Sequence, residues 1–375
     1  MKKDFENAPF RADVVGSFLR PEKLKNARKA FSEGKIDASG LKAVEDECIR
    51  DLVKKEKEHG MKGVTDGEFR RSWWHLDFMW GLNGIEKEEM KEGYHFHGEN
   101  TRNDSAHLVD KVSFNPQHPF FEHFKFLRDI AGEDVVPRQT IPAPAQTYAE
   151  LTRGENTEDI KRIYGGDNHA LLTDLATAYH KTILAFYELG CRNIQLDDCT
   201  WGMLVDRRFW TNQGGDDYDV RELADTYLEV NNMAIENLPE DLVINTHVCR
   251  GNYHSTWAAS GGYEPIANIL FSHEKVHAFY LEYDSDRAGG FEPLRFVPKD
   301  KLVVLGLITS KSPKLENREE ILGRIDDASN YIPKDRLCLS PQCGFSSTEE
   351  GNKLTEDEQW KKVDLVQSIA KEVWG

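Results

Sequence analysis

Metal-binding side chains stand at the ends of several predicted strands. His247 and Cys249 lie two residues apart, directly after the β-branched run at 242–244. Side chains of a strand alternate with a period of two, so this imidazole and this thiol leave the strand end on the same side. Glu282 and Cys343 follow two later apolar runs and offer the further donors that a tetrahedral zinc site needs. The His-x-Cys spacing by itself also fits two unrelated strand-end residues, so the prediction depends on what brings the four together.

The chemistry of this donor set favours zinc and the activation of a thiol. Two thiolates favour a borderline-soft ion. A closed tetrahedron is usually structural, but at an open site a carboxylate such as Glu282 can give way to an incoming thiol. A thiol bound to the metal has a pKa well below about 8.5 and is a nucleophile at neutral pH. We therefore predict Zn as cofactor and alkyl transfer to a small-molecule thiol. Hydrolysis by metal-bound water is the weaker alternative, because two thiolates reduce the Lewis acidity it needs.

The elements that position these residues alternate between strand and helix. Apolar runs near residues 12, 62, 135, 192, 242, 277, 302 and 336 are separated by helical patterns. This predicts an α/β fold, a (β/α)8 TIM barrel forming a single catalytic domain over residues 1–375, with an inserted polar segment near residues 86–130. A doubly wound sheet is the alternative. Since active sites of such barrels lie at the C-terminal ends of the strands, the donors are expected to converge on one mouth.

Other polar residues at the same strand ends fit an amino-acid thiol. Glu68 and Asp197 are anions that can hold an ammonium group, and the turn at Val15, Gly16 and Ser17 offers N–H groups and a hydroxyl to a carboxylate. Each of them also has an ordinary explanation as a strand-end cap or a partner of a nearby arginine. Jointly they predict a pocket for a zwitterion.

The charge and the composition of the chain limit the classes of partner that it can bind. The formal charge of −17 disfavours nucleic acid and anionic membranes. The first residues lack the apolar core of a signal peptide and no run reaches membrane-spanning length, so we expect a cytoplasmic protein whose cysteines are thiols. His95 and His97 share the spacing of a ligand pair, but no cysteine or carboxylate cluster that would complete a site lies nearby, and we do not assign them. The sequence leaves open whether the chain forms a homo-oligomer.

In combination these segments resemble the catalytic C-terminal domain of cobalamin-independent methionine synthase, and the chain resembles a short, single-domain relative of that enzyme. The similar segments span nearly the whole chain: Val15-Gly16-Ser17-Phe18, Thr65-Asp66-Gly67-Glu68-Phe69-Arg70, Ile194-Gln195-Leu196-Asp197, His247-Val248-Cys249, Glu282, Leu305-Gly306 with Ser312-Pro313, and Pro341-Gln342-Cys343-Gly344.

The resemblance implies roles for these residues. It implies a zinc ion held by His247, Cys249, Glu282 and Cys343. It also implies that homocysteine binds through Val15, Gly16, Ser17, Glu68 and Asp197, and that a methylated folate supplies the methyl group that turns it into methionine.

The chain departs from the family on the side of the methyl donor. Lys311 stands where the family carries a histidine thought to protonate the folate, and Tyr148 is the aromatic residue nearest to the position of the folate-stacking tryptophan. After Asp197 the family has Glu-Pro, whereas this chain has Asp198-Cys199. We assign Lys311 as the expected proton donor and Tyr148 to the donor site. The alternatives are a different donor or thiol acceptor (another methylated metabolite, a corrinoid protein or an epoxide) and a non-catalytic barrel with structural zinc.

Overall fold

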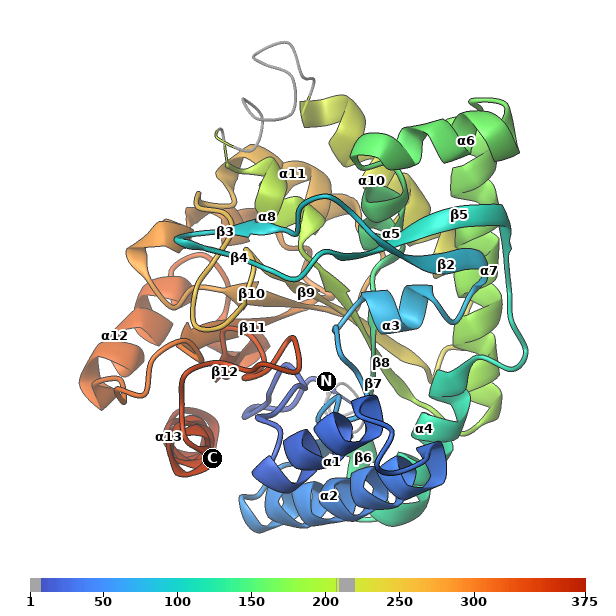
Figure 1. The fold of residues 1–375 in the computed structure, drawn as a ribbon. Coiled ribbons are helices and arrows are strands. Elements are labelled where there is room, and N and C mark those ends of the chain that lie inside the picture. The colour runs from blue at the N-terminus through green and yellow to red at the C-terminus, as the bar shows by residue number, and fades with distance from the viewer. Residues whose placement is uncertain (1–7, 207, 209–219) are drawn as a thin grey trace.

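The computed structural model describes residues 8–206, 208 and 220–375 (Figure 1). Strands and helices alternate along most of the chain. The strands are β1 (Gly63–Val64), β2 (Asn83–Glu89), β3 (His95–Phe96), β4 (Glu99–Asn100), β5 (Asp104–Ser113), β6 (Val136–Pro137), β7 (Gln139–Pro142), β8 (Asn193–Asp198), β9 (Val243–Val248), β10 (Ala278–Glu282), β11 (Leu302–Ile308) and β12 (Leu337–Pro341). The helices are α1 (Glu22–Ser32), α2 (Ala38–Glu58), α3 (Leu76–Met79), α4 (Pro119–Ala131), α5 (Pro144–Leu151), α6 (Thr157–Tyr164), α7 (Asn168–Glu188), α8 (Thr200–Leu204), α10 (Val220–Ala234), α11 (Glu264–His273), α12 (Arg318–Ser329) and α13 (Glu356–Trp374).

The centre of the molecule is a six-stranded parallel sheet in the order β12-β11-β10-β9-β8-β7. Neighbouring strands in this sheet are consecutive in the chain, and helices connect most of them, as right-handed βαβ units require. All six strands therefore end at the same edge. The predicted α/β class with a parallel sheet is confirmed.

The remaining expected strands lie at the two margins of this sheet. β1 pairs with β6, which directly precedes β7 in the chain, and Ala12 forms a parallel bridge with Leu339 of β12. The first expected strand is thus only a bridge, because Gly16 turns the chain away with a φ of 139°. A Cβ atom on Gly16 would lie 2.9 Å from Thr140 Cγ2, so this close approach also requires glycine.

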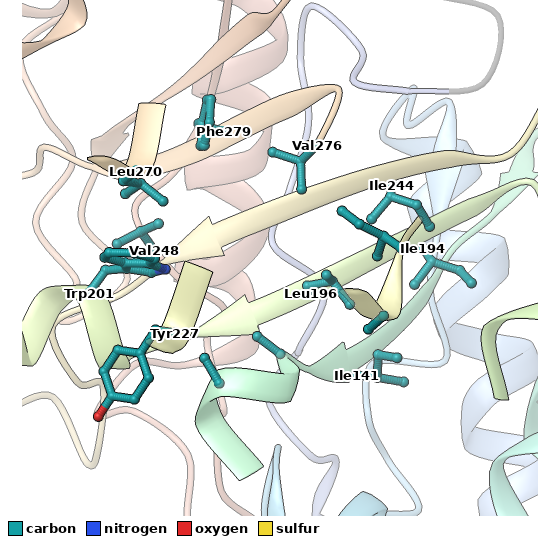
Figure 2. Close-up of a cluster of buried hydrophobic side chains, with 14 of the residues drawn as sticks. Ile141, Ile194, Leu196, Trp201, Tyr227, Ile244, Val248, Leu270, Val276 and Phe279 are labelled. Carbon is teal, nitrogen blue, oxygen red and sulfur yellow. The ribbon is translucent and has the colours of Figure 1, made fainter. Parts of the chain in front are cut away.

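Strand alternation separates an apolar outer face from a polar inner face. Ile194 and Leu196 of β8 pack with Ile244 and Val248 of β9 beneath the helices, as Figure 2 shows for this cluster. Gln195 has the opposite orientation and belongs to a buried polar network. The outer face forms the main hydrophobic core, and the inner face is free for polar residues.

A buried ion pair ties distant segments together on the inner side. Arg138 donates to both carboxylate oxygens of Asp13, at 2.7 and 2.8 Å, and to Gln195 Oε1 at 3.4 Å. The Tyr280 hydroxyl donates to Asp13 at 2.7 Å. These four side chains come from the segment before Gly16 and from the regions of β7, β8 and β10, so the first segment and the sheet share one interior.

The polar segment near residues 86–130 contains two antiparallel pairs and a helix. β2 pairs with β5, and β3 pairs with β4 in a short hairpin. The hairpin turns toward the sheet's C-terminal edge, where the His97 N–H donates to the Trp257 carbonyl at 2.8 Å. α4 packs against β6, α2 and α7 and so serves as a connecting helix between β1 and β6. Within the described ranges, none of the helices combines the length and apolarity of a membrane span.

Candidate active site

The register of β8 and β9 brings polar side chains together at the sheet edge. Asp197 is the partner of His247, and the Cys249 N–H donates to the Asp198 carbonyl at 3.1 Å beyond the last paired residues. Side chains of paired residues on parallel strands lie side by side, and every second residue shares a face. Asp197 and His247 are therefore neighbours, and two residues further on Cys199 and Cys249 are neighbours as well.

Three of the four predicted metal donors form a compact buried group. The donor atoms of His247, Cys249 and Cys343 all lie within 4.8 Å of one another. The two sulfur atoms are 3.1 Å apart, and His247 Nε2 is 3.3 Å from the Cys343 sulfur. One imidazole and two thiols fit zinc, which prefers these donors.

The orientation of His247 suits a metal ligand. Its Nδ1 lies 3.3 Å from the Tyr280 carbonyl oxygen, which can only accept a hydrogen bond. Nδ1 therefore carries a proton, and Nε2 is the ring nitrogen that faces the sulfur atoms. Burial alone would lower the pKa of His247, but its hydrogen bond with Cys249 and the nearby Asp197 raise it above the ordinary value.

The surroundings of Cys249 favour the thiolate form of its side chain. Hydrogen bonds from the Cys199 and Cys343 thiols hold the pKa of Cys249 well below its usual range despite its burial. The Gly251 N–H donates to the same sulfur at 3.2 Å. A deprotonated sulfur is the form that binds a metal.

Glu282 lies beside the three donors but is already bound on both oxygens. Oε2 accepts the Arg250 backbone N–H at 2.8 Å, and Oε1 accepts Arg287 at 2.5 Å and lies 3.5 Å from Lys311 Nζ. The side chain is fully buried. In this arrangement its carboxylate is neutralised by cations of the protein.

A cavity of about 1030 Å³ opens over the three donors. Its wall includes the predicted substrate residues Val15, Ser17, Glu68 and Asp197 together with the donors themselves. The prediction that residues from distant strand ends face one common space agrees with this arrangement. The cavity is much larger than an amino acid and has room for a second molecule.

Burial dominates the pKa values of the two carboxylates on the cavity wall. Burial raises the pKa of Asp197 to about 7, with His247 opposing this shift and Glu68 adding to it. Burial likewise raises the pKa of Glu68, although Arg71 and Arg20 lie close. Glu68 Oε1 accepts the Thr140 hydroxyl at 2.9 Å, whereas its buried Oε2 has no hydrogen-bond partner among the described residues. A cationic group between these carboxylates would satisfy both.

The remaining predicted residues are placed elsewhere. Lys311, Tyr148, Gly16 and Glu282 are absent from the described cavity wall. Lys311 is 3.5 Å from Glu282 and 4.0 Å from Asp284, and its side chain is only 7% exposed. Tyr148 is buried in α5 within the hydrophobic core. The roles of Lys311 and Tyr148 toward the methyl donor stay predictions.

Two parts of the site were missed in the sequence. Cys199 lies on the cavity wall beside Cys249, and the β3–β4 hairpin contributes Phe96, His95 and His97 to the same wall. The signal for Cys199 is the matching x-spacing of Asp197-x-Cys199 and His247-x-Cys249, which becomes informative only once β8 and β9 are known to be neighbours in register. His95 and His97 share an x-spacing in the sequence as well, but this spacing does not reveal that the hairpin lies over the cavity.

Comparisons with known proteins identify the family to which this chain is similar. Residues 159–358 match the model of the cobalamin-independent synthase catalytic domain. The uncharacterized protein YxjH of Bacillus subtilis (strain 168) is 45% identical over 98% of this chain and 95% of its own length. The methionine synthase of Pyrococcus abyssi (strain GE5 / Orsay) is 26% identical over 88% of this chain and 85% of its own length.

A solved structure shows a similar fold. It is that of a Listeria monocytogenes protein whose assignment as a vitamin-B12-independent methionine synthase is itself provisional. It has a TM-score of 0.77 and 38% identity, covering 98% of this chain and 99% of the other. The family match covers more than half of the chain and includes all four predicted metal donors, so the chain belongs to the cobalamin-independent methionine synthase family.

Proposed function

We propose that this protein is a zinc-dependent methyltransferase that converts homocysteine to methionine. The observation that carries the proposal is the group of His247, Cys249 and Cys343 at the floor of a cavity whose wall holds two buried carboxylates. Family membership supports methyl transfer, and the donor set supports a thiol acceptor. We further propose that the six-stranded sheet, β1 and the segment before Gly16 close into a (β/α)8 barrel, as the shared buried ion pair of Arg138 and Asp13 supports.

The metal residues fit zinc. His247, Cys249 and Cys343 would hold the ion, with Glu282 as the fourth ligand that the family resemblance implies. When bound, zinc supplies a lowered pKa for a thiol and so makes it a nucleophile at neutral pH. The chain's own contribution is to fix the tautomer of His247 through the Tyr280 carbonyl.

The other residues of the wall would orient the acceptor. The free Oε2 of Glu68 and the carboxylate of Asp197 would bind the ammonium group of homocysteine. Ser17 would face its carboxylate from the opposite segment. Binding both ends of the amino acid would leave its thiol at the sulfur cluster, and thiol chemistry of this kind belongs in the cytoplasm, where thiols stay reduced.

Two kinds of methyl donor are candidates for the proposed reaction. A methylated folate is the donor implied by the resemblance, and the cavity has room for a second molecule beside homocysteine. The placement of Lys311 and Tyr148 away from the wall favours the alternative of another methylated donor. A structural role for zinc is disfavoured because the three donors line an open cavity instead of being enclosed.

Methionine formation tests the proposal. Zinc-loaded protein, L-homocysteine and a methylated folate carrying a labelled methyl group are incubated, and labelled methionine is measured by mass spectrometry. We expect labelled methionine from the wild type and none from His247→Ala, with Cys191→Ser as a control that leaves the site untouched. If the wild type gives no methionine with a folate or with any other methylated donor, the proposed activity is wrong.

A further inference from the structure

A chain of hydrogen bonds joins His75, Tyr94 and Glu150 on the wall of the cavity. Glu150 is 2% exposed and forms an ion pair with Arg153, which donates to Oε1 at 2.9 Å. The Ser105 hydroxyl donates to the same oxygen at 2.6 Å. Carboxylate oxygens only accept hydrogen bonds, so Glu150 forms the accepting end of the chain.

This chain determines which nitrogen of His75 carries the proton. The Tyr94 hydroxyl donates its single proton to Glu150 Oε2 at 2.8 Å. The Tyr94 oxygen therefore accepts from His75 Nε2, which lies 3.0 Å away. Burial lowers the pKa of His75 to about 4, so the imidazole is neutral at pH 7 and has only the proton on Nε2. His75 Nδ1 is left as a hydrogen-bond acceptor.

No hydrogen bond to His75 Nδ1 is present in the part of the chain that the structure describes, although the residue is only 3% exposed. His75 is the N-cap residue of α3, yet its side chain accepts no N–H of that helix. A buried acceptor without a partner is costly, and most such atoms in native proteins are satisfied. Since His75 lies on the cavity wall, a ligand in the cavity is the natural source of the missing donor.

The wall around His75 suits a flat ring. Trp74 stacks on His75 with ring centroids 4.5 Å apart and an angle of 29° between the rings. Trp74, Tyr94 and Phe96 all line the cavity, and aromatic side chains favour stacking with flat heterocycles. The Arg153 guanidinium lies over the Tyr94 ring, 4.3 Å from its centroid, and helps to hold the tyrosine in place.

We propose that His75 Nδ1 is the hydrogen-bond acceptor that recognises the second substrate, a flat nitrogen heterocycle that presents an N–H group. Tyr94 and Glu150 are positioning residues, because they hold His75 in the tautomer that accepts. The inference rests on the proposed function only in taking this second molecule to be the methyl donor. It favours heterocyclic donors over methylated cations such as betaines, which have no N–H group to offer.

Two substitutions of His75 separate its two nitrogens. The amide of glutamine replaces Nε2 as the donor to Tyr94, whereas the oxygen of asparagine replaces Nδ1 as the acceptor. Titration calorimetry measures the binding of a methylated tetrahydrofolate, whose reduced ring carries N–H groups, and of glycine betaine, which lacks them. We expect His75→Gln to weaken folate binding by at least about tenfold and His75→Asn to retain most of it. His107→Gln changes a histidine of β5 outside the described cavity wall and should bind as the wild type does.

The opposite order of the two variants would overturn the inference. Loss of binding in His75→Asn but not in His75→Gln is the result expected if His75 only supports Tyr94. A wild type that binds glycine betaine but not the folate, or that binds neither probe, also overturns it. Folate binding that depends on His75 without any methionine formation would leave this inference standing and contradict the proposed activity.

Nitrogen NMR of wild-type protein with labelled histidine tests the tautomer without any variant or ligand. We expect a neutral His75 ring at pH 7 with the proton on Nε2. A proton on Nδ1 would overturn the inference even if the His75 variants fail to fold.

Discussion

At the scale of single residues, the site depends on two neighbouring sulfur atoms whose negative charge a metal ion would balance. Cys249 and Cys343 lie 3.1 Å apart, and hydrogen bonds from neighbouring thiols lower the pKa of Cys249. A buried anion without a cation is costly. Zinc would supply the missing positive charge, which is why we regard these cysteines as ligands and not as ordinary core residues.

Replacing Cys343 tests whether this cysteine is a zinc ligand. Cys343→Ser is expected to lower zinc affinity by more than about tenfold, because a serine hydroxyl is a poor substitute for a thiolate ligand. Cys338→Ser in β12 is the matched control, since Cys338 is equally buried but packs in a separate cluster with Tyr280 and Val304. Competition with a chelator of known affinity measures the zinc affinity of both variants. Equal zinc affinity in the two variants would place the metal elsewhere.

At the scale of elements, α8 and the end of β9 act as one unit. Gly202→Ala is expected to destabilise the protein by about 1–3 kcal/mol, because the added Cβ must push α8 away from the Cys249 carbonyl. The same displacement should weaken zinc binding. The unfolding midpoint in urea and a zinc titration measure the two effects.

Gly323 provides the comparison for this substitution. It lies in α12, and a Cβ atom there would have no heavy atom within 4 Å. Gly323→Ala is expected to stabilise the protein by about 0.5–1 kcal/mol, as alanine does in an open helix position. If Gly202→Ala also stabilises the protein and leaves zinc binding unchanged, the close packing of α8 has no functional role.

A second set of elements meets at a pair of buried acids. The Asn231 side-chain amide of α10 donates to Asp198 at the end of β8 and to Glu274 after α11, at 3.1 and 2.9 Å. Burial and the neighbouring Asp198 raise the pKa of Glu274 to about 8. Folding therefore favours the protonated form of Glu274.

This arrangement predicts a pH dependence of stability. Between about pH 4.3, the ordinary pKa of glutamate, and about 8, the folded state holds one more proton than the unfolded state. Stability then falls as pH rises through this window, by up to about 1.4 kcal/mol per pH unit. Glu274→Gln should remove this contribution, so its stability relative to the wild type rises with pH. Urea unfolding at pH 5.5, 6.5 and 7.5 measures the difference, and a constant difference would refute the assignment.

At the scale of the whole molecule, the sequence predicts the strands of the central sheet better than the segments that lie around it. Short apolar runs locate β8 to β12, because each strand lies in a parallel sheet covered by helices. The segment at Ala12 was expected as a strand, but it contributes only one bridge before Gly16 turns away. The β3–β4 hairpin has no apolar alternation, since it lies over the cavity instead of in the core.

Some residues of the site are predictable from the sequence, and others are not. His247, Cys249 and Cys343 are predictable because strand ends converge at one edge of a parallel sheet. Cys199 requires the register of β8 and β9, which is a tertiary property. The ion pair between Glu282 and Arg287 could not be predicted either, since the sequence does not reveal which cation lies beside a given carboxylate.

Titration calorimetry with L-homocysteine tests the central claim most directly. Zinc-loaded wild type is compared with zinc-free protein and with Glu68→Gln, while Glu92→Gln changes an exposed carboxylate on the same wall as a control. We predict binding that weakens at least about tenfold without zinc and in Glu68→Gln, because thiol and ammonium contacts are each worth about 1.4 kcal/mol or more. Glu92→Gln should bind as the wild type does. Absence of binding, or equal affinity with and without zinc, would contradict a site that activates the thiol of an amino acid.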